Sequence, residues 1–328
     1  MRSDLVTTAV CHAPRRQASR PLARPEANGD AAPQRARRRR MGVTIVGVVG
    51  LGNMGLGMAG SLLRGGFTVI GYDPSAARQD LSRSAGVRVR ESLTAVMEEA
   101  EALVFSLPAA RDVEAVVTSG GLLARRDASV VAIDTSTSDP GTSRRLAHVL
   151  AEAGHALLDA PVSGGPAGAA AGTLTMMIGG AAADLQRVRS VLEAMAAKIV
   201  HVGPSGAGNV AKLVNNLLVA AHLVTAQEAL RLSEAAGLPA EAALGVINAA
   251  TGRSAATEVS IPRWVIPGTF DSGFSAGLMR KDVRLALEMA AETGVALPLS
   301  GLVGQLWRDA PFADSDDFTR MADFRRET

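Results

Sequence analysis

The sequence predicts an α/β protein with a doubly wound sheet in its N-terminal half, a long connecting helix and an all-helical C-terminal half. Three observations lead to this fold class. Short apolar, β-branched runs alternate with amphipathic helical stretches from residue 43 to about residue 203. A glycine-rich turn directly follows the first of these runs. Beyond residue 208 no strand pattern returns.

The expected strands and helices follow one another in an order that is typical of a parallel sheet. The first strand is expected over residues 43–50 and a helix over 54–63, while Pro74 and Ser75 open a second helix. Further strands are expected at residues 67–72, 102–107, 130–133, 156–158 and 174–178. This alternation implies a mostly parallel sheet that is covered by helices on both faces.

Residues 209–236 contain neither proline nor glycine and are expected to form one long helix. Shorter helical segments follow, and they are separated by the breakers Gly237, Pro239, Gly252, Pro262 and Pro267. We therefore expect a domain boundary near residues 203–208. The two domains are expected over residues 41–205 and 206–328, and the long helix joins them.

The 328-residue chain has a net charge of +2, which hides a split between two parts. Residues 1–40 hold ten arginines and three acidic residues, whereas the rest holds 24 basic and 29 acidic residues. This basic extension shows no pattern that could bury a face, so we expect it to be disordered. We favour translation from Met41; a transit peptide and a nucleic-acid-binding tail are the functional alternatives.

The composition excludes several classes of protein and site. Cys11 is the only cysteine, so the chain can form neither an intramolecular disulfide nor a thiolate metal cluster. No apolar run approaches the roughly 20 residues of a membrane-spanning helix. The folded part is mildly acidic and only 3% of residues are aromatic, which argues against nucleic acid as a partner. The five histidines are scattered, and no metal site is expected.

The turn after the first strand reads GLGNMG, a pattern typical of dinucleotide binding. Gly50 permits the tight turn, Gly52 lets the backbone approach a pyrophosphate, and Gly55 lets the next helix pack closely. Asn53 and Met54 complete the turn. A tight strand-to-helix turn without a ligand is the alternative. We expect a Rossmann-type, NAD(P)-binding domain in this half of the chain.

Asp73 ends the second expected strand and supplies the acidic residue that this motif requires about twenty residues further on. Its carboxylate is placed to accept hydrogen bonds from ribose hydroxyls and to repel the 2′-phosphate of NADP. We therefore expect NAD rather than NADP. Arg78, one helical turn along, could instead attract a phosphate, although an exposed helix face is the plainer interpretation.

Lysine is scarce, with three lysines against 31 arginines, so the position of each one is informative. Lys212 lies near the start of the long helix, and Asn215 and Asn216 follow at i+3 and i+4 on the same face. An ordinary exposed stripe is one interpretation. Glycines at 203, 206 and 208 favour a site instead, because they allow close backbone approach at a domain junction, where ligands usually bind.

Residues 159–172, which read DAPVSGGPAGAAAG, are too rich in small residues for a core strand or a good helix. We expect an anion-binding turn in which Ser163 and the amides of Gly164 and Gly165 hold a carboxylate. A linker loop is the alternative. The pair Lys281 and Asp282 allows no interpretation from sequence context alone.

Four separated blocks resemble the β-hydroxyacid dehydrogenase family, which contains 3-hydroxyisobutyrate dehydrogenases and tartronate semialdehyde reductases (2-hydroxy-3-oxopropionate reductases). The blocks are GLGNMG (50–55), DAPVSGGPAGAAAGTL (159–174), GPSGAGNVAKLVNN (203–216) and FSAGLMRKD (274–282). The similarity covers about residues 42–310. It implies a Rossmann domain, an interdomain helix, and a helical domain that mediates formation of a homodimer or homotetramer.

The same resemblance implies roles for individual residues. Lys212 would be the catalytic acid/base, and Asn216, with Asn215 beside it, would orient the substrate. The turn at Ser163 would hold the substrate carboxylate, and Lys281 would close on the cofactor. Three further positions would line the nicotinamide side, namely Leu107, Pro108 and Thr137.

Together these features predict an NAD-dependent oxidoreductase that interconverts a small 3-hydroxy carboxylate and its aldehyde or ketone. An imine reductase is one rival, although the resemblance there would predict Asp or Tyr in place of Lys212. A 6-phosphogluconate dehydrogenase would need a longer helical domain, and a non-catalytic nucleotide-binding protein is the third rival. We expect a cytoplasmic location, with the mitochondrial matrix as the alternative. The sequence leaves open which hydroxy acid is used and in which direction.

Overall fold

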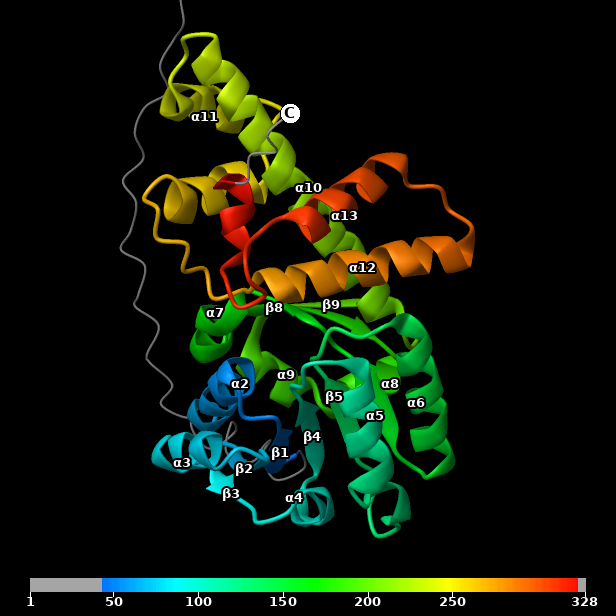
Figure 1. Ribbon diagram of the computed structural model, residues 1–328. Coiled ribbons are helices and arrows are strands. Elements are labelled where there is room, and N and C mark those ends of the chain that lie inside the picture. The colour runs from blue at the N-terminus through cyan, green and yellow to red at the C-terminus, as the bar shows by residue number, and fades with distance from the viewer. Residues whose placement is uncertain (1–42, 324–328) are drawn as a thin grey trace, which may run out of the picture. The chain divides into compact units, whose positions relative to one another are not determined.

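A computed structural model describes residues 43–323 (Figure 1). The basic extension, residues 1–40, lies outside the described residues. The strands are β1 Ile45–Val49, β2 Thr68–Tyr72, β3 Arg88–Val89, β4 Ala102–Phe105, β5 Val131–Asp134, β6 Ala156–Asp159, β7 Val162–Ser163, β8 Leu174–Gly179 and β9 Ala196–Gly203. The helices up to the end of the sheet are α2 Asn53–Arg64, α3 Ala76–Ser84, α4 Leu93–Glu99, α5 Ala110–Ser119, η2 Leu122–Ala124, α6 Pro140–Glu152, α7 Gly165–Ala171, α8 Ala182–Arg187 and α9 Arg189–Met195. The helices beyond the sheet are α10 Ala207–Ala235, α11 Ala240–Ala249, η3 Ala256–Val265, α12 Ala276–Thr293, α13 Pro298–Asp309 and η4 Phe318–Asp323.

The strands form one sheet in the order β3-β2-β1-β4-β5-β6-β8-β7, and β9 pairs with β8. All neighbours from β3 to β6 are parallel. Strand β8 runs antiparallel to β6 and β7 but parallel to β9. The predicted fold class, a Rossmann-type doubly wound sheet followed by helices, is confirmed.

Three strands were not expected from the sequence. Strands β3 and β7 have two residues each, which is too short for any alternation of apolar and polar residues to be visible. Strand β9 reads AAKIVHVG, and most of its residues are exposed or half-buried. Its alanines follow directly on helix α9, so the sequence resembles a continuation of that helix.

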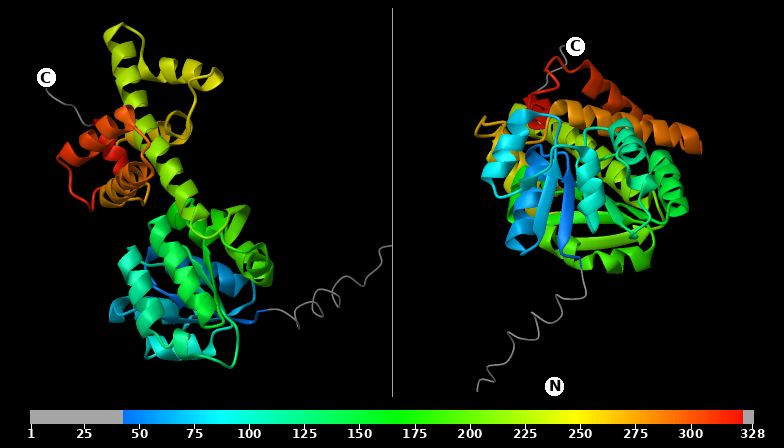
Figure 2. Two further views of the ribbon diagram at one scale, coloured as in Figure 1. Left: turned by 90° about the vertical axis from the view of Figure 1, so that its right-hand side faces the viewer. Right: turned by 90° about the horizontal axis from the view of Figure 1, so that it is seen from below.

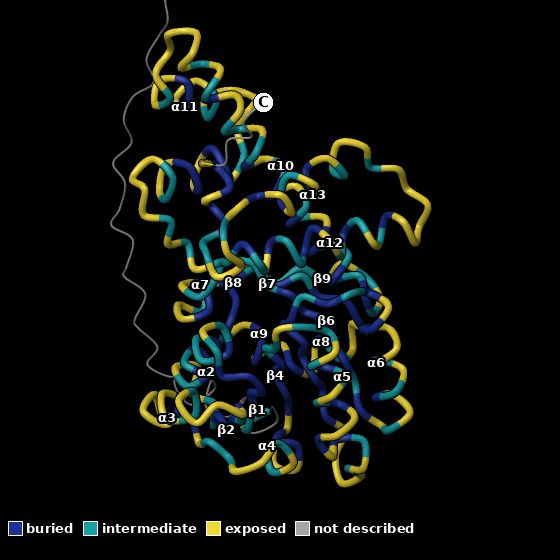
Figure 3. The backbone as a smooth tube through the Cα atoms, in the orientation of Figure 1, coloured by how far each residue is buried: buried dark blue, intermediate teal, exposed yellow. Residues whose placement is uncertain are grey.

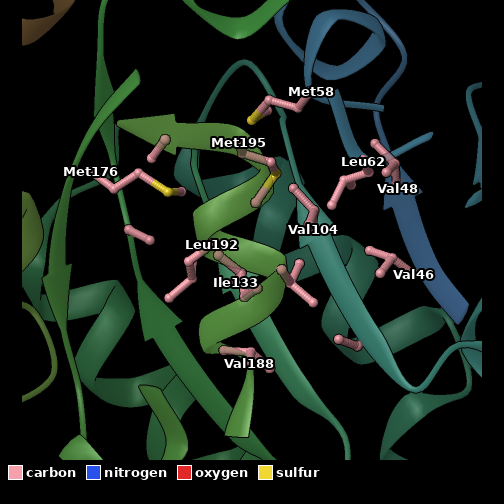
Figure 4. Close-up of a cluster of buried hydrophobic side chains, with 14 of the residues drawn as sticks. Val46, Val48, Met58, Leu62, Val104, Ile133, Met176, Val188, Leu192 and Met195 are labelled. Carbon is pink, nitrogen blue, oxygen red and sulfur yellow. The ribbon is translucent and has the colours of Figure 1, made fainter. Parts of the chain in front are cut away.

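Two apolar cores fill the space between the sheet and the helices on its two faces. On one face, Val46 and Val48 of β1 pack with Met58 and Leu62 of α2 and with Met195 of α9 (Figure 4). On the other face, β4 and β5 pack against helices α4, α5 and α6. The central strands are buried along their length (Figure 3). Each fully buried large apolar side chain stabilises the fold by roughly 1.5 to 3 kcal/mol.

The chain beyond the sheet is helical and packs along α10 (Figure 2). A third core joins Leu223 of α10 to Ile261 of η3, Val283 of α12 and Trp307 of α13. The indole Nε1 of Trp307 donates a hydrogen bond to the carbonyl oxygen of Ala220 at 3.3 Å. Helix α10 is therefore the element that the other helices share. Among residues 43–323, no helix is long and apolar enough to cross a membrane.

The small-residue segment 159–172 differs from the expected irregular turn. It contains the short strand β7 and the helix α7, of which one face is buried. Helix α7 has only seven residues, two of which are glycines, so it would not be stable alone; it forms because Ala169 is buried against α2. Gly172, with φ +72°, ends this helix in the left-handed conformation that favours glycine. The anion-binding turn expected at Ser163 is the connection between β7 and α7.

His155 is buried and is held in its neutral form, which makes the stability of this fold depend on pH. The amide of Val130 donates to Nδ1 at 3.2 Å, so the ring proton lies on Nε2, which is 2.9 Å from the carbonyl oxygen of Leu122. Burial lowers the pKa of His155 below its ordinary value of 6.5. The contribution of His155 to the free energy of unfolding is therefore fully present above pH 6.5. It falls as the pH drops from 6.5 through the lowered pKa of the folded state.

We expect the wild type to lose more free energy of unfolding between pH 7.5 and pH 5.5 than His155→Gln, whose side chain does not titrate. Urea unfolding at the two pH values measures this difference. Asp134, whose pKa burial raises to about 7, titrates alike in both proteins, so the comparison isolates His155. Equal losses in the two proteins would contradict the assignment.

Candidate active site

The carboxyl ends of the parallel strands meet along one edge of the sheet, where the turns after β1, β4, β5 and β6 lie. Strand β1 pairs with β2 on one side and with β4 on the other, so the strand order reverses there. Ligands of open α/β sheets bind in the crevice outside such a reversal. Gly50, Leu107 and Thr137 all follow these strands closely.

The glycine turn after β1 has the geometry that a pyrophosphate requires. Gly50 has φ +88°, and a Cβ on Gly55 would lie 1.8 Å from its carbonyl oxygen, so only glycine permits this approach. At Gly52 the space is open, because apart from Gly52 and its two chain neighbours no described atom lies within 4 Å of where a Cβ would stand. Met54 packs against the core below. Helix α2 has no side-chain cap and no acidic residue in its first turn, so its amides can bind an anion. These residues fit a dinucleotide.

The carboxylate of Asp73 faces the same turn. Its Oδ2 accepts a hydrogen bond from the amide of Leu51 at 2.8 Å, and its Oδ1 accepts one from the amide of Ser75 at 2.9 Å. Each oxygen keeps a lone pair that a ribose hydroxyl can use. Arg78 does not lie along a purely solvated helix face, because it donates to Oδ1 of Asn53 at 2.9 Å. Its guanidinium therefore lies at the first residue of α2.

Lys281 of helix α12 reaches the loops after β4 and β5. Its Nζ donates to the carbonyl oxygen of Thr137 at 3.0 Å and to that of Pro108 at 3.3 Å. The amide of Leu107 donates to Oγ of Ser136 at 3.0 Å, which ties the two loops together. The residues expected on the nicotinamide side thus lie together, beside the lysine expected to close on the cofactor.

Lys212 is buried in the second turn of α10, with 7% of its surface exposed. Burial lowers the pKa of its amine from the ordinary 10.5; the negative charge of Asp282 opposes this shift, and the positive charge of Lys281 adds to it. A buried lysine with a lowered pKa holds a neutral amine nearer to neutral pH. Such an amine can take a proton from a hydroxyl group and return it.

Asp282 of α12 lies beside Lys212, Asn216 and Lys281, and we refer to these four side chains together as the charged group. Its Oδ2 accepts a hydrogen bond from Nδ2 of Asn216 at 2.6 Å, and its Oδ1 lies 3.6 Å from Nζ of Lys281. The carboxylate is 1% exposed, and burial raises its pKa while the two lysines lower it. Asn215 is half-buried and donates to Oδ1 of Asn216 at 3.1 Å, so it is one step removed from the carboxylate.

The role of Asp282 in this group was missed in the sequence, although a signal for it was present. Met279, Val283 and Ala286 form the buried face of α12, and Asp282 lies on that face. A carboxylate is rarely buried unless it is paired, so its place on an apolar face indicates a charged partner.

Asp159 holds the first turn of α10 at the end of β6. Its Oδ1 accepts a hydrogen bond from the amide of Gly206 at 2.7 Å, and its Oδ2 accepts one from the amide of Asn209 at 3.0 Å. The carboxylate is fully buried; burial raises its pKa, and these N–H groups lower it. A Cβ on Gly208 would lie 2.5 Å from the carbonyl oxygen of Asp159, so glycine allows the close approach. Lys212 therefore stands on a helix whose start is fixed to the sheet.

The turn between β7 and α7 presents backbone amides at the same edge of the sheet. Gly164 and Gly165 have φ +124° and +61°, conformations that favour glycine. Ser163 pairs with Thr175 of β8, which fixes the start of the turn. Among the described residues, no hydrogen bond joins this turn to Lys212 or Asn216. Within residues 43–323, no group of three or more His, Cys, Asp or Glu is arranged to hold a metal ion.

Comparison with known proteins places both halves of the chain in one family. The model for the NAD-binding domain of 6-phosphogluconate dehydrogenase matches residues 45–203, and that for NAD-binding of NADP-dependent 3-hydroxyisobutyrate dehydrogenase matches residues 206–324. The 2-(hydroxymethyl)glutarate dehydrogenase of Eubacterium barkeri is 38% identical to this chain, over 80% of this chain and 87% of its own length. The chain belongs to the β-hydroxyacid dehydrogenase family.

Other members of the β-hydroxyacid dehydrogenase family agree with this assignment. The structure of Mycobacterium tuberculosis 3-hydroxyisobutyrate dehydrogenase with L-serine has a TM-score of 0.81 and 35% identity, covering 85% of this chain and 98% of that one. The NAD-dependent L-serine dehydrogenase of Pseudomonas aeruginosa is 37% identical, over 80% of this chain and 91% of its own length. The expected class, an NAD-dependent oxidoreductase of hydroxy acids, is confirmed, and NAD is confirmed as the cofactor.

Proposed function

We propose that this chain interconverts a small 3-hydroxy carboxylate and its aldehyde or ketone, with Lys212 as the general acid/base. The observation that carries the proposal is the buried amine of Lys212, whose pKa is lowered, within a charged group at the cofactor edge. Bound NAD supplies the hydride acceptor of the oxidation. Lys212 takes the hydroxyl proton in that direction and returns it in the reduction.

The other site residues bind and orient the substrate. We propose that Ser163, Gly164 and Gly165 hold the substrate carboxylate through the hydroxyl group and the turn amides. Asn216 is held by Asp282 and is placed to orient the reacting hydroxyl. Asn215 supports it through their mutual hydrogen bond.

The cofactor residues divide by the part of the dinucleotide that they face. We propose that the pyrophosphate lies on the turn and the α2 N-terminus, while Asp73 binds the adenosine ribose. The nicotinamide side is formed by the two loops that Lys281 contacts. The residues assigned to the cofactor are Gly50, Gly52, Asn53, Met54, Gly55, Asp73, Leu107, Pro108, Thr137 and Lys281.

A substrate panel tests the function. The relatives are named for 2-(hydroxymethyl)glutarate, 3-hydroxyisobutyrate and L-serine, so these three acids, with NAD and with NADP, form its core. We expect turnover of at least one of them by the wild type, and a raised KM in Ser163→Ala with little change in NADH affinity. A protein that binds NADH but turns over no hydroxy carboxylate would overturn the proposal.

Asp73 is expected to set the preference for NAD. We expect Asp73→Ser to narrow the ratio of kcat/KM for NAD over NADP, because the charge that repels the 2′-phosphate is removed. Arg78→Gln is the matched variant, since its guanidinium lies beside the same turn. A wild type that already prefers NADP would show that Arg78 outweighs Asp73.

We propose that the helical half associates into a homodimer or homotetramer. Seven large apolar side chains there are at least 46% exposed, namely Val214, Leu218, Leu232, Val246, Val295, Leu299 and Leu302. Burial of these apolar side chains against a second copy of the chain is favourable. Light scattering should give a mass of at least twice the 33.7 kDa of one chain, and Leu218→Asp should lower it. Leu81→Asp, at an equally exposed leucine of α3, should not. A monomeric wild type would refute the proposal.

We propose domains over residues 41–205 and 206–328, which meet where β9 ends and α10 begins.

A cytoplasmic location is our proposal; the 3-hydroxyisobutyrate dehydrogenases of Mus musculus and Pongo abelii are named as mitochondrial.

A further inference from the structure

Helices α2 and α7 pack so closely that the backbone of one lies against the backbone of the other. A Cβ on Gly57 of α2 would lie 2.9 Å from the amide nitrogen of Ala170 and 3.0 Å from Cβ of Ala169, both on α7. Gly57 therefore lets the two helices approach as closely as their backbones allow. A shift of one helix must be followed by the other, because closely packed interfaces do not deform smoothly.

Two polar side chains of α2 bind the carbonyl end of α7. The buried hydroxyl of Ser61 donates to the carbonyl oxygen of Ala169 at 2.7 Å. Arg64 donates through Nη2 to the carbonyl oxygen of Ala170 and to Oγ of Ser61, the latter at 2.8 Å. A cation at the C-terminus of a helix is favourable, because the last carbonyls have no partner within the helix.

The opposite end of α7 lies against the helical half of the chain. Gly273, in the loop before α12, would place a Cβ 3.3 Å from Cδ of Pro166. The carbonyl oxygen of Ser272 lies 3.9 Å from where a Cβ on Gly165 would stand. Asp317 holds this loop by accepting hydrogen bonds from Oγ of Ser272 and from the amide of Gly273. Helix α7 thus lies between α2, whose N-terminus faces the proposed cofactor site, and the helical half of the chain.

We propose that Ser61 and Arg64 are positioning residues that couple cofactor binding at α2 to carboxylate binding at the turn before α7. Neither residue is placed to touch either ligand, and both fix α7 to the helix whose N-terminus faces the pyrophosphate. NAD or NADH that settles α2 therefore settles the turn at Ser163, and by linkage the carboxylate raises the affinity for the cofactor equally. The inference rests on the proposed function, which assigns these two sites.

The test compares the wild type with the double variant Ser61→Ala/Arg64→Gln. Fluorescence titration gives the Kd of NADH alone and in saturating 3-hydroxyisobutyrate, and hydrogen exchange with NADH alone follows residues 164–173. In the wild type we expect the acid to lower the Kd of NADH about fivefold or more, and NADH to slow exchange in α7. In the variant, the Kd of NADH alone should change little, while both effects shrink to less than half.

A matched control is Arg189→Gln/Ser190→Ala, a neighbouring arginine and serine on the exposed start of α9. It should retain both effects, whereas a general loss of stability in the first variant would weaken NADH binding itself. Unchanged coupling and unchanged protection of α7 in the first variant would overturn the inference. A wild type in which bound NADH does not slow hydrogen exchange in α7 would also overturn the inference. Protection of α7 by NADH that the first variant loses, with no effect of the acid on the Kd of NADH, would support the link between α2 and α7 and count against 3-hydroxyisobutyrate as the substrate.

Discussion

Lys212→Ala should lower kcat by about 10² to 10⁴, because a positioned acid/base typically contributes that range. The amine is buried next to Asp282, and Lys281, the other lysine of this group, donates to the carbonyl oxygens of Pro108 and Thr137. NADH affinity and melting temperature should stay near those of the wild type, since the cofactor contacts lie on other elements. Steady-state kinetics with the best acid of the panel, together with NADH titration, measure both sides of this prediction.

The pH profile separates proton transfer from charge alone. Since burial lowers the pKa of Lys212 from 10.5, kcat/KM for oxidation should rise with pH through a value below 10.5 and then level off. Lys212→Arg keeps the charge but cannot deprotonate, so it should lose activity almost as severely as Lys212→Ala. A Lys212→Ala enzyme with more than a tenth of the wild-type kcat would refute the assignment, as would an unchanged profile in Lys212→Arg.

Asp159→Ala should be the most destabilising single change near the site. It leaves the buried amides of Gly206 and Asn209 without an acceptor, and each such amide costs about 1 to 3 kcal/mol. For a unit of this size, about 2 to 4 °C of melting temperature is lost per kcal/mol, so a fall of about 5 °C or more is expected. Because α10 carries Lys212, kcat should fall as well.

The matched control is Asp139→Ala, which removes a carboxylate that caps α6 at a half-buried position. Its Oδ1 accepts from the amide of Thr142 at 2.7 Å, and loss of such a cap typically costs about 1 kcal/mol. Asp159→Asn should lie between the two, because the amide keeps one acceptor oxygen. If thermal melts rank Asp139→Ala as the more damaging change, the anchoring role of Asp159 is wrong.

Local patterns were sufficient to predict the fold and the cofactor turn. The run before Gly50 is apolar and β-branched, and the need for glycine at positions 50 and 55 follows from backbone geometry within six residues. The long helix was expected at residues 209–236 and is observed at Ala207–Ala235. Its start lies two residues earlier because Gly206, with φ +90°, ends the preceding turn. Segments as short as β3 and β7, with two residues each, carry too few residues for a periodic signal.

The order of the elements, the glycine turn after β1, and the helix face that Lys212 and Asn216 share could all be predicted, because each depends on residues that are near neighbours in the chain. Contacts between residues that are distant in the chain depend instead on how the helices and the sheet pack. Asp282 lies 66 positions from Asn216, yet the two share a hydrogen bond of 2.6 Å. Helix α7 has only seven residues, two of them glycines, and it forms because it packs against α2. Burial and the charges gathered from α10 and α12 shift the pKa of Lys212, and those surroundings exist only once the two helices have packed.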